Sequence, residues 1–168
     1  MKRIIAIDYG DARTGVAVSD LTGTLAGEAL TIQEWNAEKL AQRLAFFARE
    51  RDAEKFVLGL PKNMDGTEGP RAEKARQFKE LLEEASGLPV ILWDERRSTI
   101  EAHAILHAAG KKEKKHRANV DAVAATLLLE GYLASPNRYK IKPERVLLFR
   151  AFVILVWRAC GDRPCALP

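Results

Sequence analysis

The chain has 168 residues, a mass of 18.7 kDa and a formal net charge of +4, with 47% hydrophobic and 30% charged residues. This length predicts one domain with one core and excludes an enzyme built from two large lobes around its ligand. The composition is that of a globular protein, and the first ten residues reach an aspartate too early for a secretory signal, so we expect a cytoplasmic protein.

Three strands are predicted to open the chain. The apolar runs "KRIIAIDYG" (2–10) and "TGVAVSD" (14–20) flank a short polar turn, which predicts a hairpin. The segment 24–32 is typical of a third, antiparallel strand. The apolar spacing then changes to that of a helix, which we expect to start at an N-cap on Asn36 and to end near Arg51.

Strands and helices alternate in the middle of the chain. The run 55–60 predicts a short buried strand, and a loop with two glycines and two prolines follows it. Pro70 fits the first position of the next helix, which we expect to stop at Ser86 and Gly87. The run 88–93 predicts a further buried strand.

Two more helices complete the predicted domain. Residues Ser98 to Glu101 form a capping box for a helix that ends at Gly110, and Asn119 is expected to cap the last helix, over 120–133. This order of elements predicts an α/β domain over residues 1–137, with a mixed five-stranded sheet flanked by helices. Residues 138–168 form a basic and apolar extension to which we assign no role.

Carboxylates stand where several predicted elements begin or end. Asp8 ends the first strand, Asp94 and Glu95 end the last strand, and Asp121 falls in the first turn of the last helix. Such residues can converge at one edge of a sheet and hold Mg²⁺ or Mn²⁺, which prefer oxygen ligands and assist phosphodiester cleavage. Alternatively, each carboxylate caps a turn, pairs with a neighbouring arginine or complements a helix dipole.

Four segments carry a resemblance to a known family. In chain order they are "IDYGDARTGVAVSD", "LGLPKNMDGTEGPRA", "WDERRST" and "NVDAVAATLLLEGYL". Together they resemble the YqgF/RuvX family of pre-16S rRNA nucleases and Holliday-junction-resolvase-like proteins, over about residues 3–135. The resemblance implies a ribonuclease H-like fold, with Asp8, Glu95 and Asp121 as catalytic residues that hold Mg²⁺ or Mn²⁺.

The resemblance also implies a function. We expect a divalent-metal-dependent nuclease that hydrolyses phosphodiester bonds in 5′-end processing of pre-16S rRNA, as a monomer or homodimer. One alternative is a Holliday junction resolvase acting on branched DNA, and another is a nucleic-acid-binding factor without activity. The apolar stretch 146–157 is shorter than the roughly 20 residues of a membrane span, so we expect no membrane partner.

Basic residues near the motifs are candidates for contacts with nucleic acid. Residues 111–117 carry five Lys and Arg against one Glu, which suits a loop that meets phosphates. A solvent-exposed loop is the alternative explanation. The candidate contacts are Arg13, Lys62, Arg96, Lys111, Lys112, Lys114, Lys115 and Arg117.

Overall fold

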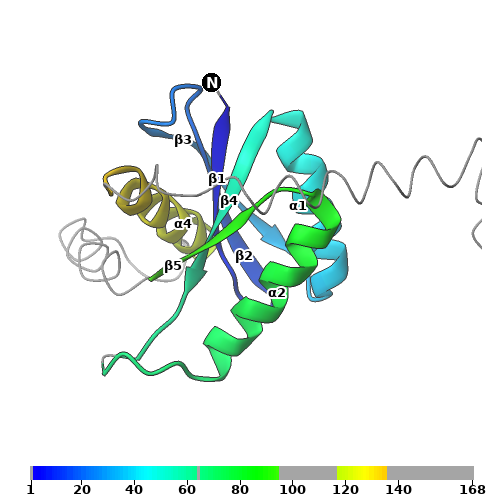
Figure 1. The fold of residues 1–168 in the computed structure, drawn as a ribbon, viewed down its shortest axis with the longest axis vertical. Helices are drawn as coiled ribbons and strands as arrows, with labels where there is room; N and C mark the ends of the chain where they lie inside the picture. Colours follow the sequence, from blue (N-terminus) through cyan, green and yellow to red (C-terminus); the bar gives the residue numbers. More distant parts are fainter. Residues whose placement is uncertain (1, 64, 95–116, 136–168) are drawn as a thin grey trace, which may run out of the picture. The chain divides into compact units, whose positions relative to one another are not determined.

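The structure is a computed structural model that describes residues 2–63, 65–94 and 117–135 (Figure 1). Within these ranges five strands form one sheet, and three helices cover it. The strands are β1 (Arg3–Asp8), β2 (Arg13–Ser19), β3 (Ala26–Gln33), β4 (Ala53–Leu60) and β5 (Val90–Asp94). The helices are α1 (Ala37–Glu50), α2 (Pro70–Ser86) and α4 (Arg117–Leu133).

The sheet combines a meander with parallel strands. Its strand order is β3-β2-β1-β4-β5. β2 runs antiparallel to β1 and β3, whereas β1, β4 and β5 are parallel to one another. This topology confirms the predicted hairpin and the predicted mixed five-stranded sheet. The carboxyl ends of the three parallel strands lie at one edge, where open α/β sheets bind ligands.

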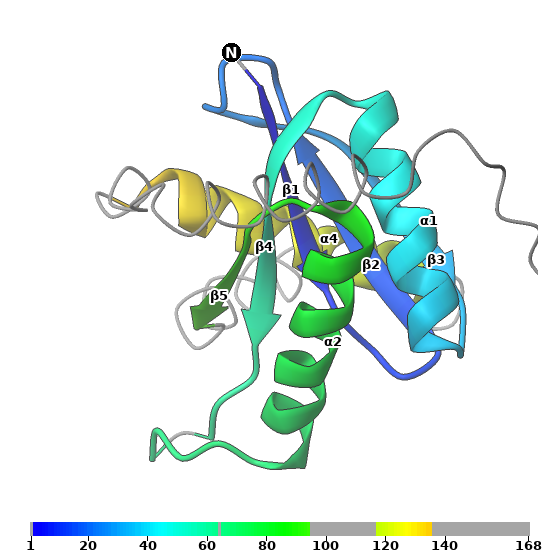
Figure 2. The same cartoon turned by 45° about the vertical axis from the view of Figure 1, so that its right-hand side comes forward.

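Helices cover both faces of the sheet (Figures 1 and 2). Along β1, Ile5 and Ile7 pack in the cluster that contains α1 and α2, whereas Ile4 and Ala6 pack in the cluster that contains α4. A strand buried on both faces needs apolar residues at consecutive positions, which explains the run that opens the sequence. Because side chains alternate along a strand, Asp8 is on the same face as Ala6, toward α4.

The ends of α1 and α2 follow local sequence signals. The side chain of Asn36 accepts a hydrogen bond of 2.9 Å from the backbone N–H of Lys39, as expected of an N-cap. Helix α2 follows Gly69 and carries Pro70 in its first turn. It ends at Gly87, which adopts the left-handed conformation with φ of 67°. These predictions are confirmed.

The start of α4 corrects the sequence analysis. The helix begins at Arg117, so Asn119 lies inside it and the predicted cap is wrong. No glycine or proline interrupts residues 117–120, and asparagine continues a helix at modest cost when tertiary packing supports it. Asp121 consequently lies at the start of the second turn, and the prediction that placed it in the first turn is also wrong.

Some predictions fall on other parts of the chain. The helix expected between residues 98 and 110 and the domain boundary expected after residue 137 lie outside the described residues. Among the described helices, none combines the length and apolar character that a membrane span requires.

Candidate functional site

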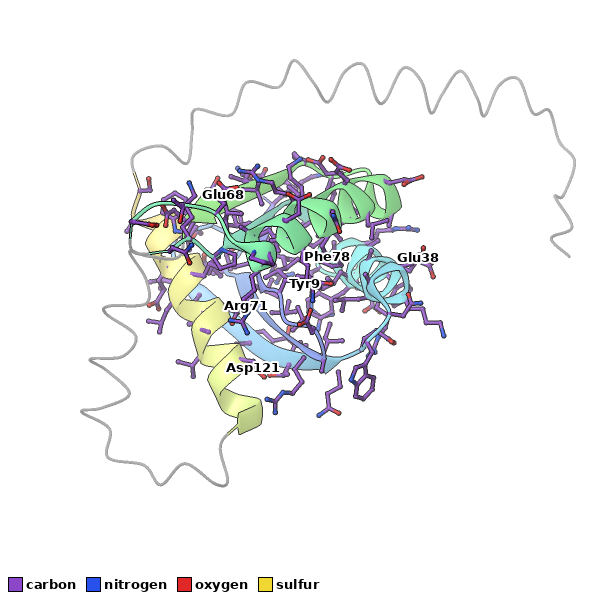
Figure 3. All side chains as sticks on the ribbon, turned by 90° about the horizontal axis from the view of Figure 1, so that it is seen from below. Tyr9, Glu38, Glu68, Arg71, Phe78 and Asp121 are labelled. Carbon is purple, nitrogen blue, oxygen red and sulfur yellow. The ribbon has the colours of Figure 1, made fainter. Side chains whose placement is uncertain are left out.

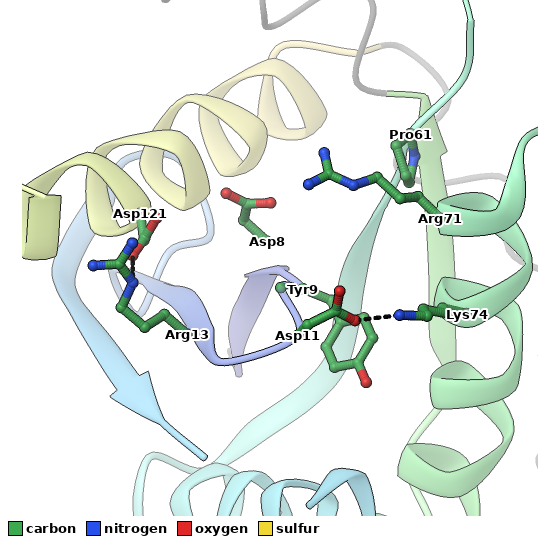
Figure 4. A pocket seen from close by; sticks show the side chains of 9 residues that line it. Asp8, Tyr9, Asp11, Arg13, Pro61, Arg71, Lys74 and Asp121 are labelled. Atoms are coloured by element: carbon green, nitrogen blue, oxygen red, sulfur yellow. Dashed lines mark hydrogen bonds and ion pairs between the residues drawn. The ribbon is translucent and has the colours of Figure 1, made fainter. Parts of the chain in front are cut away.

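A pocket of about 250 Å³ opens at the carboxyl end of β1 (Figure 4). Strand β1, the turn to β2, the loop after β4, the start of α2 and α4 all contribute to it. Charged side chains dominate the lining. The lining residues are Asp8, Tyr9, Gly10, Asp11, Arg13, Pro61, Arg71, Lys74 and Asp121.

Asp8 and Asp121 meet in this pocket although 112 residues separate them in the sequence. Burial raises the pKa of Asp8 above its usual value, and the nearby negative charge of Asp121 raises it further. The positive charge of Arg71 acts in the opposite direction. A desolvated Asp8 carboxylate beside a second carboxylate forms a site that a bound cation would stabilise.

Close packing between α4 and β2 brings Asp121 to Asp8. Gly15 pairs with Asp8 in the sheet, and a Cβ atom on Gly15 would lie 1.9 Å from the backbone carbonyl oxygen of Asp121. Only a residue without a side chain allows the backbone of α4 to come this near. The sequence analysis did not identify this role of Gly15.

Asp121 retains unused capacity for a ligand. Its Oδ2 atom is buried and receives no hydrogen bond from the described part of the chain. The Nε atom of Arg13 lies 3.4 Å from the same oxygen, as an ion pair (Figure 4). A buried carboxylate oxygen with no hydrogen-bond donor beside a second desolvated carboxylate suits a hard divalent cation. The pocket therefore brings together two of the three residues predicted to hold the metal, and their chemistry fits a divalent cation.

The turn after β1 is fixed by contacts with α2. The Tyr9 ring stacks on Phe78, with 4.2 Å between ring centroids and 3° between planes. Lys74 Nζ lies 2.6 Å from Asp11 Oδ1, and this hydrogen bond holds the pKa of Asp11 below its usual value. A Cβ on Gly10 would lie 2.4 Å from the carbonyl oxygen of Arg13, so glycine is required for this turn. These contacts hold the turn, whose residues line the pocket, in place against α2.

The remaining candidates lie in different places. Lys62 is not among the pocket's lining residues, and its Nζ atom lies 3.6 Å from Glu68 Oε1, which also accepts a hydrogen bond from Arg76. Arg117 begins α4. Asp94 ends β5, paired in register with Leu60. The candidates outside the described residues are Glu95, Arg96, Lys111, Lys112, Lys114 and Lys115.

Four polar side chains that line the pocket were not predicted from the sequence: Tyr9, Asp11, Arg71 and Lys74. Tyr9 and Asp11 adjoin motif positions in the first turn. For Arg71 and Lys74 a signal existed, because residues in the first turns of a helix that follows a strand's carboxyl end border the ligand edge of an α/β sheet. Within the described residues, no three acidic, histidine or cysteine side chains form a metal-binding group.

Comparison with known proteins gives consistent results. Residues 2–135 match the model of the family RuvX, described as Holliday junction resolvase. A relative from Halothermothrix orenii is 42% identical over 137 residues, which span 81% of this chain and 97% of that protein. A relative from Thermoanaerobacter pseudethanolicus is 42% identical over 134 residues, 79% of this chain and 96% of that protein. Both carry the name "Putative pre-16S rRNA nuclease".

Solved structures with the same fold are distant in sequence. Thermus thermophilus RuvC in complex with a Holliday junction substrate superposes with a TM-score of 0.52 at 12% identity, covering 76% of this chain and 92% of that chain. A second structure of Thermus thermophilus RuvC gives a TM-score of 0.50 at 13% identity and covers 75% and 92%. This similarity confirms the ribonuclease H-like fold class.

Proposed function

This chain belongs to the RuvX family, and from that membership we propose that it is a divalent-metal-dependent nuclease acting in the 5′-end processing of pre-16S rRNA. Its relatives are named as nucleases, and the chain is a hydrolase of this kind. The finer assignment to ribosome biogenesis rests on the names of those relatives.

The observation that carries the proposal is the meeting of Asp8 and Asp121 in one charged pocket. We propose that these two residues and Glu95 hold Mg²⁺ or Mn²⁺, with Glu95 assigned from the family resemblance. When bound, the metal would activate water and neutralise charge on the phosphate.

The protein's own side chains have separate tasks in this proposal. Asp8 and Asp121 supply oxygen ligands, and their desolvated setting strengthens the interaction with a cation. Arg13 orients the Asp121 carboxylate through their ion pair and is near enough to the pocket to meet a substrate phosphate. The proposed contacts of Lys62, Arg96 and the basic loop 111–117 add affinity for the backbone of the nucleic acid.

The substrate has one serious alternative. The family model's description names a Holliday junction resolvase, which would cut branched DNA twice and therefore act as a homodimer. We favour pre-rRNA because the relatives that cover most of the chain carry that name. A competition assay between a single-stranded RNA and a four-way DNA junction, at one salt concentration, separates the two. Symmetric cutting of the junction in preference to RNA would favour the resolvase.

The test of the site uses Asp8→Asn, Glu95→Gln and Asp121→Asn. An amide keeps the size of the side chain and loses the charge that holds a hard cation, so each variant should lose cleavage while circular dichroism stays native. The control is Glu38→Gln, because Glu38 is exposed on α1 and Figure 3 shows it away from Asp121. Substantial turnover in a folded variant would remove that residue from the site, and turnover in all three would support a different active centre.

Metal dependence is tested on the unmodified chain. We expect a chelator to stop cleavage and to leave the fold intact, since the described core is formed by apolar contacts on both faces of the sheet. Cleavage that continues in chelator would refute the metal mechanism. A folded protein that binds nucleic acid but never cuts it would instead be the non-catalytic binding factor.

A further inference from the structure

The pocket contains three cationic side chains with different partners. Arg13 pairs with Asp121 at 3.4 Å, and Lys74 pairs with Asp11 at 2.6 Å. The side chain of Arg71 forms no hydrogen bond and no ion pair with any residue that the structure describes, although it lines the pocket. Of these three side chains, only Arg71 keeps its hydrogen-bonding capacity for a ligand.

Arg71 reaches the pocket from the wall opposite α4. In Figure 4 its guanidinium extends from the start of α2 toward Asp8, while Asp121 faces Asp8 from the other side. The charge of Arg71 is near enough to favour ionisation of both Asp8 and Asp11, yet it lies beyond ion-pairing distance of either. The gap between the arginine and Asp8 is therefore part of the pocket.

The position of Arg71 is not explained by the stability of α2. Arg71 follows Pro70 in the first turn of the helix, and Gly69 offers no side-chain cap. The amino terminus of a helix carries a partial positive charge, so a cation there is unfavourable in the absence of an anion. The same partial charge and the guanidinium would both attract an anion placed at the pocket's mouth.

We propose that Arg71 binds a non-bridging oxygen of the substrate phosphate that lies against Asp8. This inference rests on the proposed nuclease function and names a contact on the α2 side of the same site. The pocket is lined by three carboxylates and three cations, so it gains net positive charge once a divalent cation is held there. The planar guanidinium can then donate two parallel hydrogen bonds to a phosphate, which a lysine cannot do.

The two variants Arg71→Gln and Arg71→Lys test the contact. Arg76→Gln is the matched control, because Arg76 lies on the same helix, is absent from the pocket lining and forms its hydrogen bonds with Glu68. Arg71→Gln and Arg76→Gln each remove one positive charge from α2, whereas Arg71→Lys keeps the charge and loses the planar guanidinium. Thermal unfolding reports whether any of them alters the fold.

Cleavage and binding are measured separately. We expect Arg71→Gln to lower kcat/KM about 100-fold, as loss of one donor to a developing oxyanion does, with part recovered in Arg71→Lys. For a short fluorescein-labelled single-stranded RNA mixed with the protein and a divalent cation and measured before cleavage, we expect the slope of log affinity against log salt to fall by about 0.7, the loss of one phosphate contact. Arg76→Gln should change neither quantity.

The outcomes distinguish this inference from the proposed function. If wild-type protein cleaves RNA and Arg71→Gln behaves like Arg76→Gln, the contact does not exist. If Arg71→Gln instead lowers the concentration of divalent metal that cleavage requires and leaves the salt slope unchanged, Arg71 only balances the negative charge of Asp8. In that case the inference fails. If no nucleic acid is cleaved but the salt slope falls in Arg71→Gln, the nuclease function fails and the phosphate contact stands.

Discussion

Replacing Gly15 by alanine tests whether the approach of α4 to β2 forms the site. The new Cβ would lie 1.9 Å from the carbonyl oxygen and 2.6 Å from the carbonyl carbon of Asp121. Both are backbone atoms, so no side-chain rotation relieves the overlap. Helix α4 must retreat by roughly 1.5 Å before the contact becomes an ordinary one.

The cost follows from what α4 buries. Ala125, Leu128 and Leu129 of α4 are almost fully buried in the cluster with Ala6 and Ala17 of the sheet. A separation of even 1 Å forfeits up to about half of each dispersion contact. Overpacking of this kind costs about 3 kcal/mol, and the smaller backbone entropy of alanine returns about 0.5–1 kcal/mol. We therefore expect Gly15→Ala to lower the free energy of unfolding by about 2 kcal/mol.

The catalytic effect should exceed the effect on folding. A shift of this size moves Asp121 relative to Asp8, and a misplacement of about 1 Å costs on the order of 100-fold in rate. Urea denaturation measures the free energy of unfolding, and Tm should fall by about 4–8 °C. Cleavage is then measured at a temperature where the variant is folded.

A glycine on α4 itself provides the control. A Cβ on Gly131 would meet its nearest atom, Trp93 Nε1, at 3.7 Å, which is ordinary contact. Gly131→Ala should keep full activity and stabilise the protein by up to about 1 kcal/mol, since alanine favours a helix. If Gly15→Ala had native stability and native cleavage, the close packing of α4 on Gly15 would not be what positions Asp121.

Three further predictions concern charge. Asp8→Asn should make the chelator-treated protein more stable than wild type at pH 7, because burial and a neighbouring carboxylate raise the pKa of Asp8 in the folded state above its ordinary value of 3.8. Wild type loses stability as pH rises from 3.8 through the folded-state pKa. The free energies of unfolding of variant and wild type, measured by urea denaturation, should therefore converge as the pH is lowered toward 3.8. Asp20→Asn should be less stable than wild type at pH 7, because hydrogen bonds from the Thr22 hydroxyl and two backbone N–H groups lower the pKa of Asp20. The difference in Tm between variant and wild type should shrink below about pH 4, and a difference that stays constant with pH would contradict this prediction. Lys114→Ala and Lys115→Ala should each weaken RNA binding and reduce the salt slope by about 0.7, the value for one phosphate contact to a single strand, without lowering kcat. Unchanged affinity in both variants would remove the loop from the interface.

Local patterns in the sequence determined most of the fold. The consecutive apolar residues of β1, the cap at Asn36, and the start and end of α2 at Pro70 and Gly87 all involve residues within a few positions of each other. Such signals act through backbone dihedrals and short-range hydrogen bonds, so they can be recognised without knowledge of distant neighbours. The same reasoning marked Asp8 as a carboxylate that ends an otherwise apolar strand.

Tertiary structure decided how the site is assembled. The meeting of Asp121 with Asp8 depends on packing between segments more than 100 residues apart. Gly15 resembles any glycine near a turn until the backbone of α4 lies against it, and Arg71 resembles a surface cation until α2 is placed beside β1. These positions depend on distances across the folded chain, because charge and steric overlap act through space whereas a sequence pattern records only spacing along the backbone.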